Sequence, residues 1–173
     1  MSCVAVPVSE VSSSERELMV SSFLRELLAQ EDITDQETLD AHHARLQEEF
    51  AELFSQETLC IMDRDISLKG FVFLQKHPFG YHVSFLGVID PIYGLSKFNL
   101  ISYILKNYPP PFYAHVLPNN PLRKLATDGK FMGMKASEVP EHPAIPANPR
   151  RPSAQGWIIF TLEKETTPEP VAV

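Results

Sequence analysis

The sequence predicts an α/β (α+β) fold, a mixed, mostly antiparallel sheet of six to seven strands flanked by about four helices. Two capping-box patterns precede apolar residues at helical spacing in the first third of the chain. From Thr58 the pattern changes to short segments rich in β-forming residues, separated by turns. The length of 173 residues and a hydrophobic content of 44% suit one domain over residues 1–173.

Two helices are predicted at the start of the chain, after a weak first strand. Ser14-Glu15-Arg16-Glu17 has the capping-box pattern, and apolar residues then recur at helical spacing, namely Val20, Phe23, Leu24, Leu27 and Leu28. Thr34-Asp35-Gln36-Glu37 repeats the pattern before a second apolar stripe, Leu39, Leu46, Phe50, Leu53 and Phe54. Acidic residues occupy the other face of this second stripe, so we expect both helices to bury one face each.

The remaining elements are mainly strands. The segments "TLCIMD", "LKGFVFLQ" and "YHVSFLGVI" predict an antiparallel meander, and "FYAHVL", "KFMGMKA" and "GWIIFTLE" predict the later strands. A third helix is expected at about 96–107, with a buried stripe of Phe98, Ile101, Leu105 and Tyr108. Asn120-Pro121 predicts a short fourth helix that stops at Gly129. Because a helix separates strand 81–88 from strand 112–117, a crossover and a mixed sheet are expected.

Composition excludes several classes of function. The net charge is −7, and residues 1–60 hold 13 acids against 3 bases, which disfavours nucleic acid as a partner. No stretch reaches the apolar length of a membrane span, and the first residues lack the features of a secretory signal. Cys3 and Cys60 lack zinc-site spacing and predict neither a metal site nor a structural disulfide. We expect a soluble protein, cytoplasmic where it is synthesised, with no membrane partner.

The element order, with "VIDPIYG" and "AHVLPNNPLRKLATDGKF", resembles the GNAT N-acetyltransferase superfamily over nearly the whole chain. In that superfamily the fourth strand runs into a glycine-containing loop that opens a helix, whose N-terminal amides hold the coenzyme A pyrophosphate. The flanking positions agree, namely Val88, Pro91, Tyr93, Asn119, Leu122, Leu125 and Phe131. If coenzyme A binds, the resemblance implies cofactor contacts at Val88, Gly94, Leu95, Ser96, Lys97 and Asn119.

The loop itself departs from the superfamily pattern. With Gly94 as the first loop glycine, the second and third fall on Ser96 and Phe98; sliding by one residue places them on Leu95, Lys97 and Asn99. A Cβ at these positions hinders the close backbone approach to phosphate that glycine permits. The general-acid tyrosine that is frequent in the superfamily falls on Ala126, which has no proton to donate. These departures predict a loop that has lost its cofactor chemistry, and no bound cofactor; acetyl-CoA is the cofactor only if the protein is an enzyme.

A catalytic base, if one exists, is best sought on the strand "YHVSFLGV". His82 is the weak candidate, with Ser84 on the same face and His115 on the neighbouring predicted strand. An imidazole titrates close to neutrality and suits amine deprotonation. A structural role for His82 is the competing and more common interpretation. Cys60, in "TLCIMD", is most simply a core residue rather than a nucleophile.

A proline ladder is the most distinctive feature of the chain. Prolines recur every third residue at Pro140, Pro143, Pro146, Pro149 and Pro152. A polyproline II helix has three residues per turn, so 137–155 is predicted to be an extended insertion, with 164–173 a C-terminal tail. "PANPRR" also fits the PxxPxR pattern bound by proline-ligand domains. The five prolines, with Arg150 and Arg151, are therefore the predicted partner-binding residues; a stiff connector is the alternative.

Two functions follow from these features. The first is a catalytically degenerate GNAT-like scaffold that binds other protein subunits of an assembly. Because short-tailed bacteriophages include GNAT-like virion proteins, the resemblance makes a virion one setting for it. The second is an active acyl-CoA-dependent N-acetyltransferase with an atypical loop, using ordered water or His82 as the base. Coenzyme A binding separates the two hypotheses.

Overall fold

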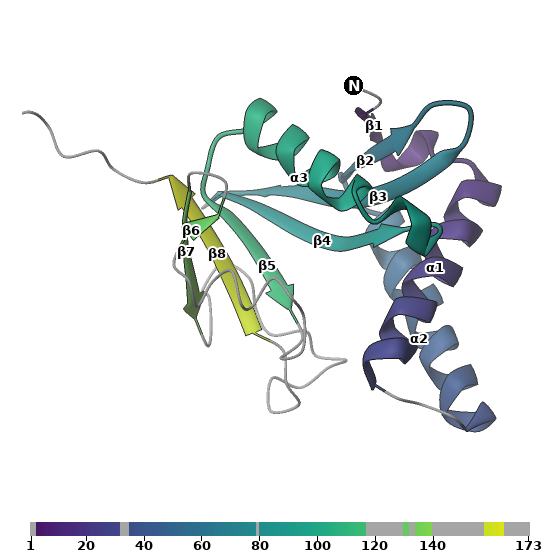
Figure 1. Ribbon diagram of the computed structural model, residues 1–173. Helices are drawn as coiled ribbons and strands as arrows, with labels where there is room; N and C mark the ends of the chain where they lie inside the picture. The colour runs from purple at the N-terminus through teal and green to yellow at the C-terminus, as the bar shows by residue number, and fades with distance from the viewer. Residues whose placement is uncertain are drawn as a thin grey trace, which may run out of the picture. The chain divides into compact units, whose positions relative to one another are not determined.

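A computed structural model describes residues 3–31, 35–78, 80–116, 130–131, 134–139 and 158–164 (Figure 1). The predicted α/β class with a mostly antiparallel sheet is confirmed. The chain divides into two compact units, one of residues 1–77 and 82–108, the other of residues 78–81 and 109–173. The expectation of one domain over the whole chain stays a prediction.

The first unit contains the three α-helices that the structure describes. Its elements are β1 (Cys3–Pro7), the 3₁₀ turn η1 (Val8–Glu10), α1 (Ser13–Glu31), α2 (Gln36–Phe54), β2 (Leu59–Arg64), β3 (Leu68–His77), most of β4 (Gly80–Val88), the 3₁₀ turn η2 (Pro91–Tyr93) and α3 (Ser96–Asn107). The strands lie in the order β1-β2-β3-β4, and β2 pairs antiparallel with both β1 and β3. All the strands and helices that the sequence predicts in this region are present.

The sheet of this unit has helices on both faces (Figure 1). On one face, Phe50 of α2 packs edge-on against Phe73 of β3, with ring centroids 5.6 Å apart. On the other face, Gly70 of β3 lies under α3, because a Cβ there would stand 2.5 Å from the Ser96 hydroxyl oxygen. Phe73 and Gly70 are three residues apart and therefore point to opposite faces of the strand. An aromatic cluster fills the α1/α2 side, formed by Phe23, Phe50, Phe54, Phe71, Phe73 and Phe85.

Both helix caps lie close to, but not at, the predicted residues. Ser12, not Ser14, forms the first capping box: its hydroxyl accepts from the Glu15 N–H, and the Ser12 N–H donates to the Glu15 carboxylate, each at 3.2 Å. Asp35, not Thr34, caps α2 by accepting from two N–H groups of the first turn. The sequence contains overlapping cap patterns at both places, and local spacing alone does not choose between them.

The buried face of α3 differs from the predicted one. Ser96, Leu100 and Ile104 are its buried residues, whereas Phe98 is 58% exposed. The prediction placed the largest apolar side chains inside. Its buried face is therefore rotated about the helix axis from the face that is buried in the structure. The serine is buried because Asp63, on β2, accepts its hydroxyl hydrogen bond, which the local sequence does not reveal.

Strand β4 contains an irregularity at Phe85. Phe85 has a φ of 52°, a value that side-chain-bearing residues rarely adopt. Its ring lies 6.2 Å from that of Phe73, while the ring of His82 lies 6.1 Å from that of His77. Phe73 and His77 share a face of β3, so His82 and Phe85 also share a face although they are three residues apart. A regular strand forbids this, and an extra residue, a β-bulge, explains it.

The second unit contains β5 (Phe112–Val116), β6 (Lys130–Phe131), β7 (Met134–Val139) and β8 (Ile158–Lys164), in the order β5-β8-β7-β6. The three pairings within it are antiparallel. The strand predicted over 130–136 is two strands, and residues 137–139 of the predicted insertion belong to β7. The predicted fourth helix, residues 140–155 and the tail after Lys164 lie outside the described residues. Among the helices that are described, none has the length and apolarity to span a membrane.

Candidate functional site

The junction of β4 and α3 carries the residues that the sequence predicts for cofactor binding. Asp90 begins it: its side chain accepts from the Ile92 N–H at 3.0 Å and caps η2. Gly94 (φ −53°, ψ −33°) and Leu95 (φ −66°, ψ −19°) then have helical dihedrals. The turn therefore continues into α3 (Ser96–Asn107) without opening into a loop.

Three backbone N–H groups at this turn and the start of α3 are bonded within the same segment. Gly94 donates to the Pro91 carbonyl at 3.2 Å, Lys97 to the Gly94 carbonyl at 3.3 Å, and Asn99 to the Leu95 carbonyl at 3.2 Å. These donors point along the helix rather than toward one common point. A phosphate cradle needs several N–H groups aimed at a single anion, and these three are not arranged in that way.

A buried carboxylate anchors the first turn of α3. Asp63, on β2, is 1% exposed and Ser96 is 3% exposed. The Ser96 hydroxyl donates to Asp63 Oδ2 at 2.6 Å, and the Asn99 amide donates to the same oxygen at 3.3 Å. Gly70, opposite Asp63 in the register of β2 and β3, leaves the room that the serine needs. The hydroxyl that the resemblance implies for cofactor binding is therefore turned inward.

Helix α1 binds the end of β4 through two neighbouring side chains. The Arg25 guanidinium donates to the carbonyls of Ile89 at 2.9 Å and Val88 at 3.3 Å. Glu26 accepts from the Val88 N–H at 3.5 Å and forms an ion pair with Lys97 at 3.2 Å. We call these contacts the α1 clasp. Its partners are separated by 62 to 71 residues of sequence, and no local pattern could have identified them.

The structure thus bonds four of the six predicted cofactor-binding residues to groups of the same chain, three of them to distant elements and one within its own turn. Val88 and Lys97 meet through Glu26, Ser96 bonds to Asp63, and the Gly94 N–H bonds within its turn. Leu95 is 78% exposed. Asn119 lies outside the described residues, as do the predicted partner-binding residues, namely Pro140, Pro143, Pro146, Pro149, Arg150, Arg151 and Pro152.

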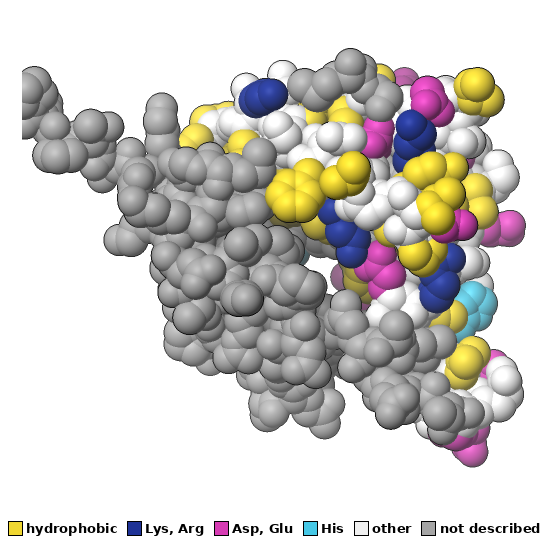
Figure 2. Space-filling model, in the orientation of Figure 1, with side chains coloured by type: hydrophobic (Ala, Val, Ile, Leu, Met, Phe, Trp, Pro, Cys, Tyr) yellow, Lys and Arg dark blue, Asp and Glu magenta, His cyan; other side chains and the backbone are white. Residues whose placement is uncertain are grey.

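Exposed apolar side chains surround the start of α3. Ile92 is 79%, Leu95 78% and Phe98 58% exposed. We call these three residues the apolar trio. In the space-filling view, apolar side chains gather on the face over this junction (Figure 2). Three large apolar residues exposed within seven positions are typical of a surface that contacts another molecule.

The catalytic candidate His82 is half-buried and lies beside a second histidine, His77. The Nε2 atom of His77 and the hydroxyl of Ser84 are both buried and have no hydrogen-bond partner among the described residues. His115 lies on β5, and the placement of its side chain is not described. Cys60 is fully buried, and burial raises the pKa of its thiol to about 12. A thiol that stays protonated in this way is a core group and a poor nucleophile.

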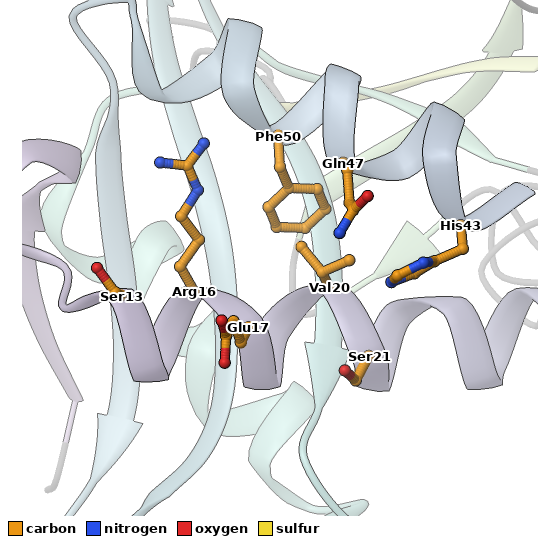
Figure 3. Close-up of a pocket in the computed structure, with 8 residues that line it drawn as sticks. All are labelled: Ser13, Arg16, Glu17, Val20, Ser21, His43, Gln47 and Phe50. Atoms are coloured by element: carbon orange, nitrogen blue, oxygen red, sulfur yellow. The ribbon is translucent and has the colours of Figure 1, made fainter.

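A groove of about 510 Å³ runs between α1 and α2 (Figure 3). Arg16 and Val20 point from α1 toward α2, and Phe50 and Gln47 point back from α2. The other lining residues are Ser13, Glu17, Ser21 and His43. The Arg16 guanidinium stands 4.3 Å from the centre of the Phe54 ring, a cation–π contact. Within the described part of the chain, no three His, Cys, Asp or Glu side chains are placed to hold a metal ion.

Comparison with known proteins identifies structures with a similar fold but no relative that is similar in sequence. No family model and no curated protein matches the sequence. Among solved structures, Escherichia coli ElaA is similar with a TM-score of 0.56 and 11% identity, over 94% of this chain and 98% of that one. A GNAT-family acetyltransferase from Staphylococcus aureus has a TM-score of 0.60 and 9% identity, over 94% and 99%. The PaiA N-acetyltransferase of Thermoplasma acidophilum, determined in complex with coenzyme A, has a TM-score of 0.53 and 14% identity, over 96% and 100%. The chain therefore has the fold of the GNAT acetyltransferases, as the sequence predicts.

Proposed function

We propose that this GNAT-fold protein is catalytically degenerate and acts as a structural or interaction component of a larger protein assembly, such as a virion. The observation that carries the proposal is that several polar groups of its β4–α3 junction bond to atoms of the same chain. Buried and partly buried polar groups need partners in any state of the protein. Where groups of the same chain already act as these partners, an incoming cofactor has to break those hydrogen bonds before it can bind.

Each internal contact works against coenzyme A in a different way. The helical dihedrals at Gly94 direct three N–H groups along the chain. The Ser96 hydroxyl is committed to Asp63. The Glu26 carboxylate, paired with Lys97, adds a negative charge where a diphosphate would have to approach. Together they occupy several of the donors that a diphosphate requires and reduce the favourable positive charge there.

Two further features support an interaction role. The apolar trio exposes three large side chains at the junction itself. The proline ladder at 140–152 has the spacing of a preordered rod, which loses little conformational entropy when it docks. Proteins are the expected partners, because the acidic charge balance disfavours nucleic acid.

The proposal is tested by titrating the protein with acetyl-CoA in an isothermal calorimeter. We expect no saturable heat at ligand concentrations up to about 1 mM, the weak end of ordinary binding. The PaiA N-acetyltransferase, which was determined with coenzyme A, is the matched positive control. A micromolar dissociation constant for this chain would overturn the proposal.

The second candidate is an active acetyl-CoA-dependent N-acetyltransferase. The observation in its favour is the pair of buried, unpartnered polar atoms beside His82, the Nε2 of His77 and the hydroxyl of Ser84. Such atoms are uncommon in folded proteins and recur at functional sites. If acetyl-CoA binds, acetylation of an amine panel by wild type and by His82→Ala decides whether His82 is the base. Equal rates would assign that role to water.

A further inference from the structure

Arg16 is a cation without an anionic partner among the residues that the structure describes. It lies on α1 (Ser13–Glu31) and is half-buried, and its guanidinium stands 4.3 Å from the centre of the Phe54 ring on α2. Within this part of the chain, no oxygen accepts a hydrogen bond from the guanidinium and no carboxylate forms an ion pair with it. A partly desolvated cation favours an incoming anion, and a planar guanidinium can donate two parallel hydrogen bonds to one carboxylate.

The groove between α1 and α2 offers such an anion a place to bind (Figure 3). The guanidinium lies toward one end of it, and the His43 ring and Ser21 lie toward the other. Between them Val20 and Phe50, which are 6% and 1% exposed, form an apolar floor, with the Gln47 amide beside it. The volume of about 510 Å³ lies within the range of small-molecule sites, roughly 300–1,000 Å³. The groove therefore combines one unpaired cation, a short apolar surface and neutral hydrogen-bonding groups.

Glu17 limits the negative charge that the groove favours. It is an exposed lining residue of α1, and no ion pair joins it to Arg16, because neighbouring residues of a helix point in different directions. Its carboxylate repels a ligand with two or more negative charges, such as a phosphate monoester or a dicarboxylate, more strongly than a ligand with one. A single carboxylate therefore gains the contact with Arg16 at the smallest electrostatic cost.

We propose that the groove between α1 and α2 binds a small organic monocarboxylate. The carboxylate accepts two hydrogen bonds from the Arg16 guanidinium, the apolar body lies over Val20 and Phe50, and a hydroxyl at the far end bonds to the His43 ring. The residues that line this groove all belong to α1 or α2, so the site shares none with the β4–α3 junction. It does not depend on whether acetyl-CoA binds.

The experiment titrates the isotope-labelled full-length protein with para-hydroxyphenylacetate and follows its amide shifts by two-dimensional NMR. We expect saturable shifts that are largest within 13–21 and 43–50, with a dissociation constant of about 1 mM or below. Tyrosol has the same ring and hydroxyl without the carboxylate and should bind at least about tenfold more weakly, because the charge-assisted hydrogen bonds are lost. para-Carboxyphenylacetate has a second carboxylate in place of the hydroxyl and should also bind more weakly, because Glu17 repels it.

Variants on both sides of the groove test its role. Arg16→Gln removes the charge and should weaken binding of para-hydroxyphenylacetate at least about tenfold, whereas Arg16→Lys keeps the charge without the planar fork and should lose less. Ser21→Leu fills the other end of the groove without changing Arg16 and should weaken binding as well. The control is Lys76→Gln, which removes an exposed cation from β3 and should bind as the wild type does. Circular dichroism establishes that each variant is folded.

Several results would overturn the proposal. They are wild-type shifts that do not saturate by about 10 mM, shifts centred outside α1 and α2, and equal affinity in wild type and folded Arg16→Gln. If Arg16→Gln does not fold, unchanged affinity in Ser21→Leu overturns it instead. Equal affinity for tyrosol and the acid would do the same, and equal or tighter binding of para-carboxyphenylacetate would overturn the preference for a single charge.

Discussion

At the scale of single residues, Asp63 illustrates how a distant partner decides local structure. Its carboxylate is buried on β2 and accepts hydrogen bonds from Ser96 and Asn99, which lie 33 and 36 residues later. A charge-assisted hydrogen bond is stronger than a neutral one, and its loss is costly where the remaining partner is buried. The orientation of α3 is therefore set largely by one acid that sequence patterns do not mark.

Replacing this acid tests that account. We expect Asp63→Ala to lower the free energy of unfolding by about 2–4 kcal/mol, because the Ser96 hydroxyl is left buried without an acceptor. Asp63→Asn keeps one acceptor and should lose less. Urea denaturation measures both. Asp65→Ala is the control: Asp65 forms an exposed pair with Lys69 at 2.8 Å, and its loss is expected to lower the free energy of unfolding much less than the loss of Asp63. Equal losses at both positions would contradict the role given to Asp63.

The candidate site shows where residue-level prediction fails. The sequence draws attention to Gly94, Ser96 and Lys97 as a departure from a glycine-rich loop. It gave no sign that Arg25 and Glu26 would meet them, because the contacts join segments more than 60 residues apart. Local patterns report which side chains can bond, but tertiary packing decides which ones do.

At the scale of elements, prediction succeeds where composition and turn residues are unambiguous. The strands from Leu59 to Val88 are short runs rich in β-forming residues between turns, and their existence needs only that pattern. Helix α3 has apolar residues on more than one side, so its buried face depends on what lies beneath it. The irregularity at Phe85 is similar: the local sequence does not mark its positive φ, and only the contacts with Phe23 and Phe50 show that the ring lies toward α1 and α2.

Two glycines beside α3 are expected to respond oppositely to alanine. At Gly70 a Cβ would lie 2.5 Å from the Ser96 hydroxyl oxygen and 3.1 Å from Leu100 Cδ1, so Gly70→Ala should cost about 1–3 kcal/mol. Gly94 has helical dihedrals, and its Cβ would meet only the Pro91 carbonyl at 3.6 Å. Gly94→Ala should therefore be neutral or stabilise by up to about 1 kcal/mol. Thermal and urea unfolding measure the change in the free energy of unfolding for both variants. If Gly94→Ala lowers it, the turn needs a glycine at this position.

At the scale of the whole molecule, the sequence predicts the fold, but for the function it only narrows the choice to two hypotheses. The order of elements can be predicted from turn residues and from β-forming and apolar patterns, and the fold is shared with solved structures at only 9–14% identity. Function depends on a handful of contacts at one junction. A fold can therefore be kept while the atoms that would bind a cofactor turn to one another, and only the site distinguishes the two cases.

The proline ladder gives the last prediction. Val139 of β7 and Ile159 of β8 are antiparallel partners, so the ends of the segment between these strands already lie side by side. Deleting 140–152 leaves "SAQGW", residues 153–157, a five-residue connection that contains Gly156 and suits a hairpin. Shortening the loop from 18 residues to 5 lowers its closure cost by about 1 kcal/mol.

The deletion variant should therefore unfold in urea with a free energy equal to that of wild type or about 1 kcal/mol higher. A full-length variant with the five prolines replaced by alanine controls for proline content, and it should match wild type within about 1 kcal/mol. This outcome would mean that the segment is dispensable for the fold and is available to a partner. A loss of more than about 2 kcal/mol in the deletion, with none in the alanine variant, would show that the segment packs on its own chain and is not free to dock elsewhere.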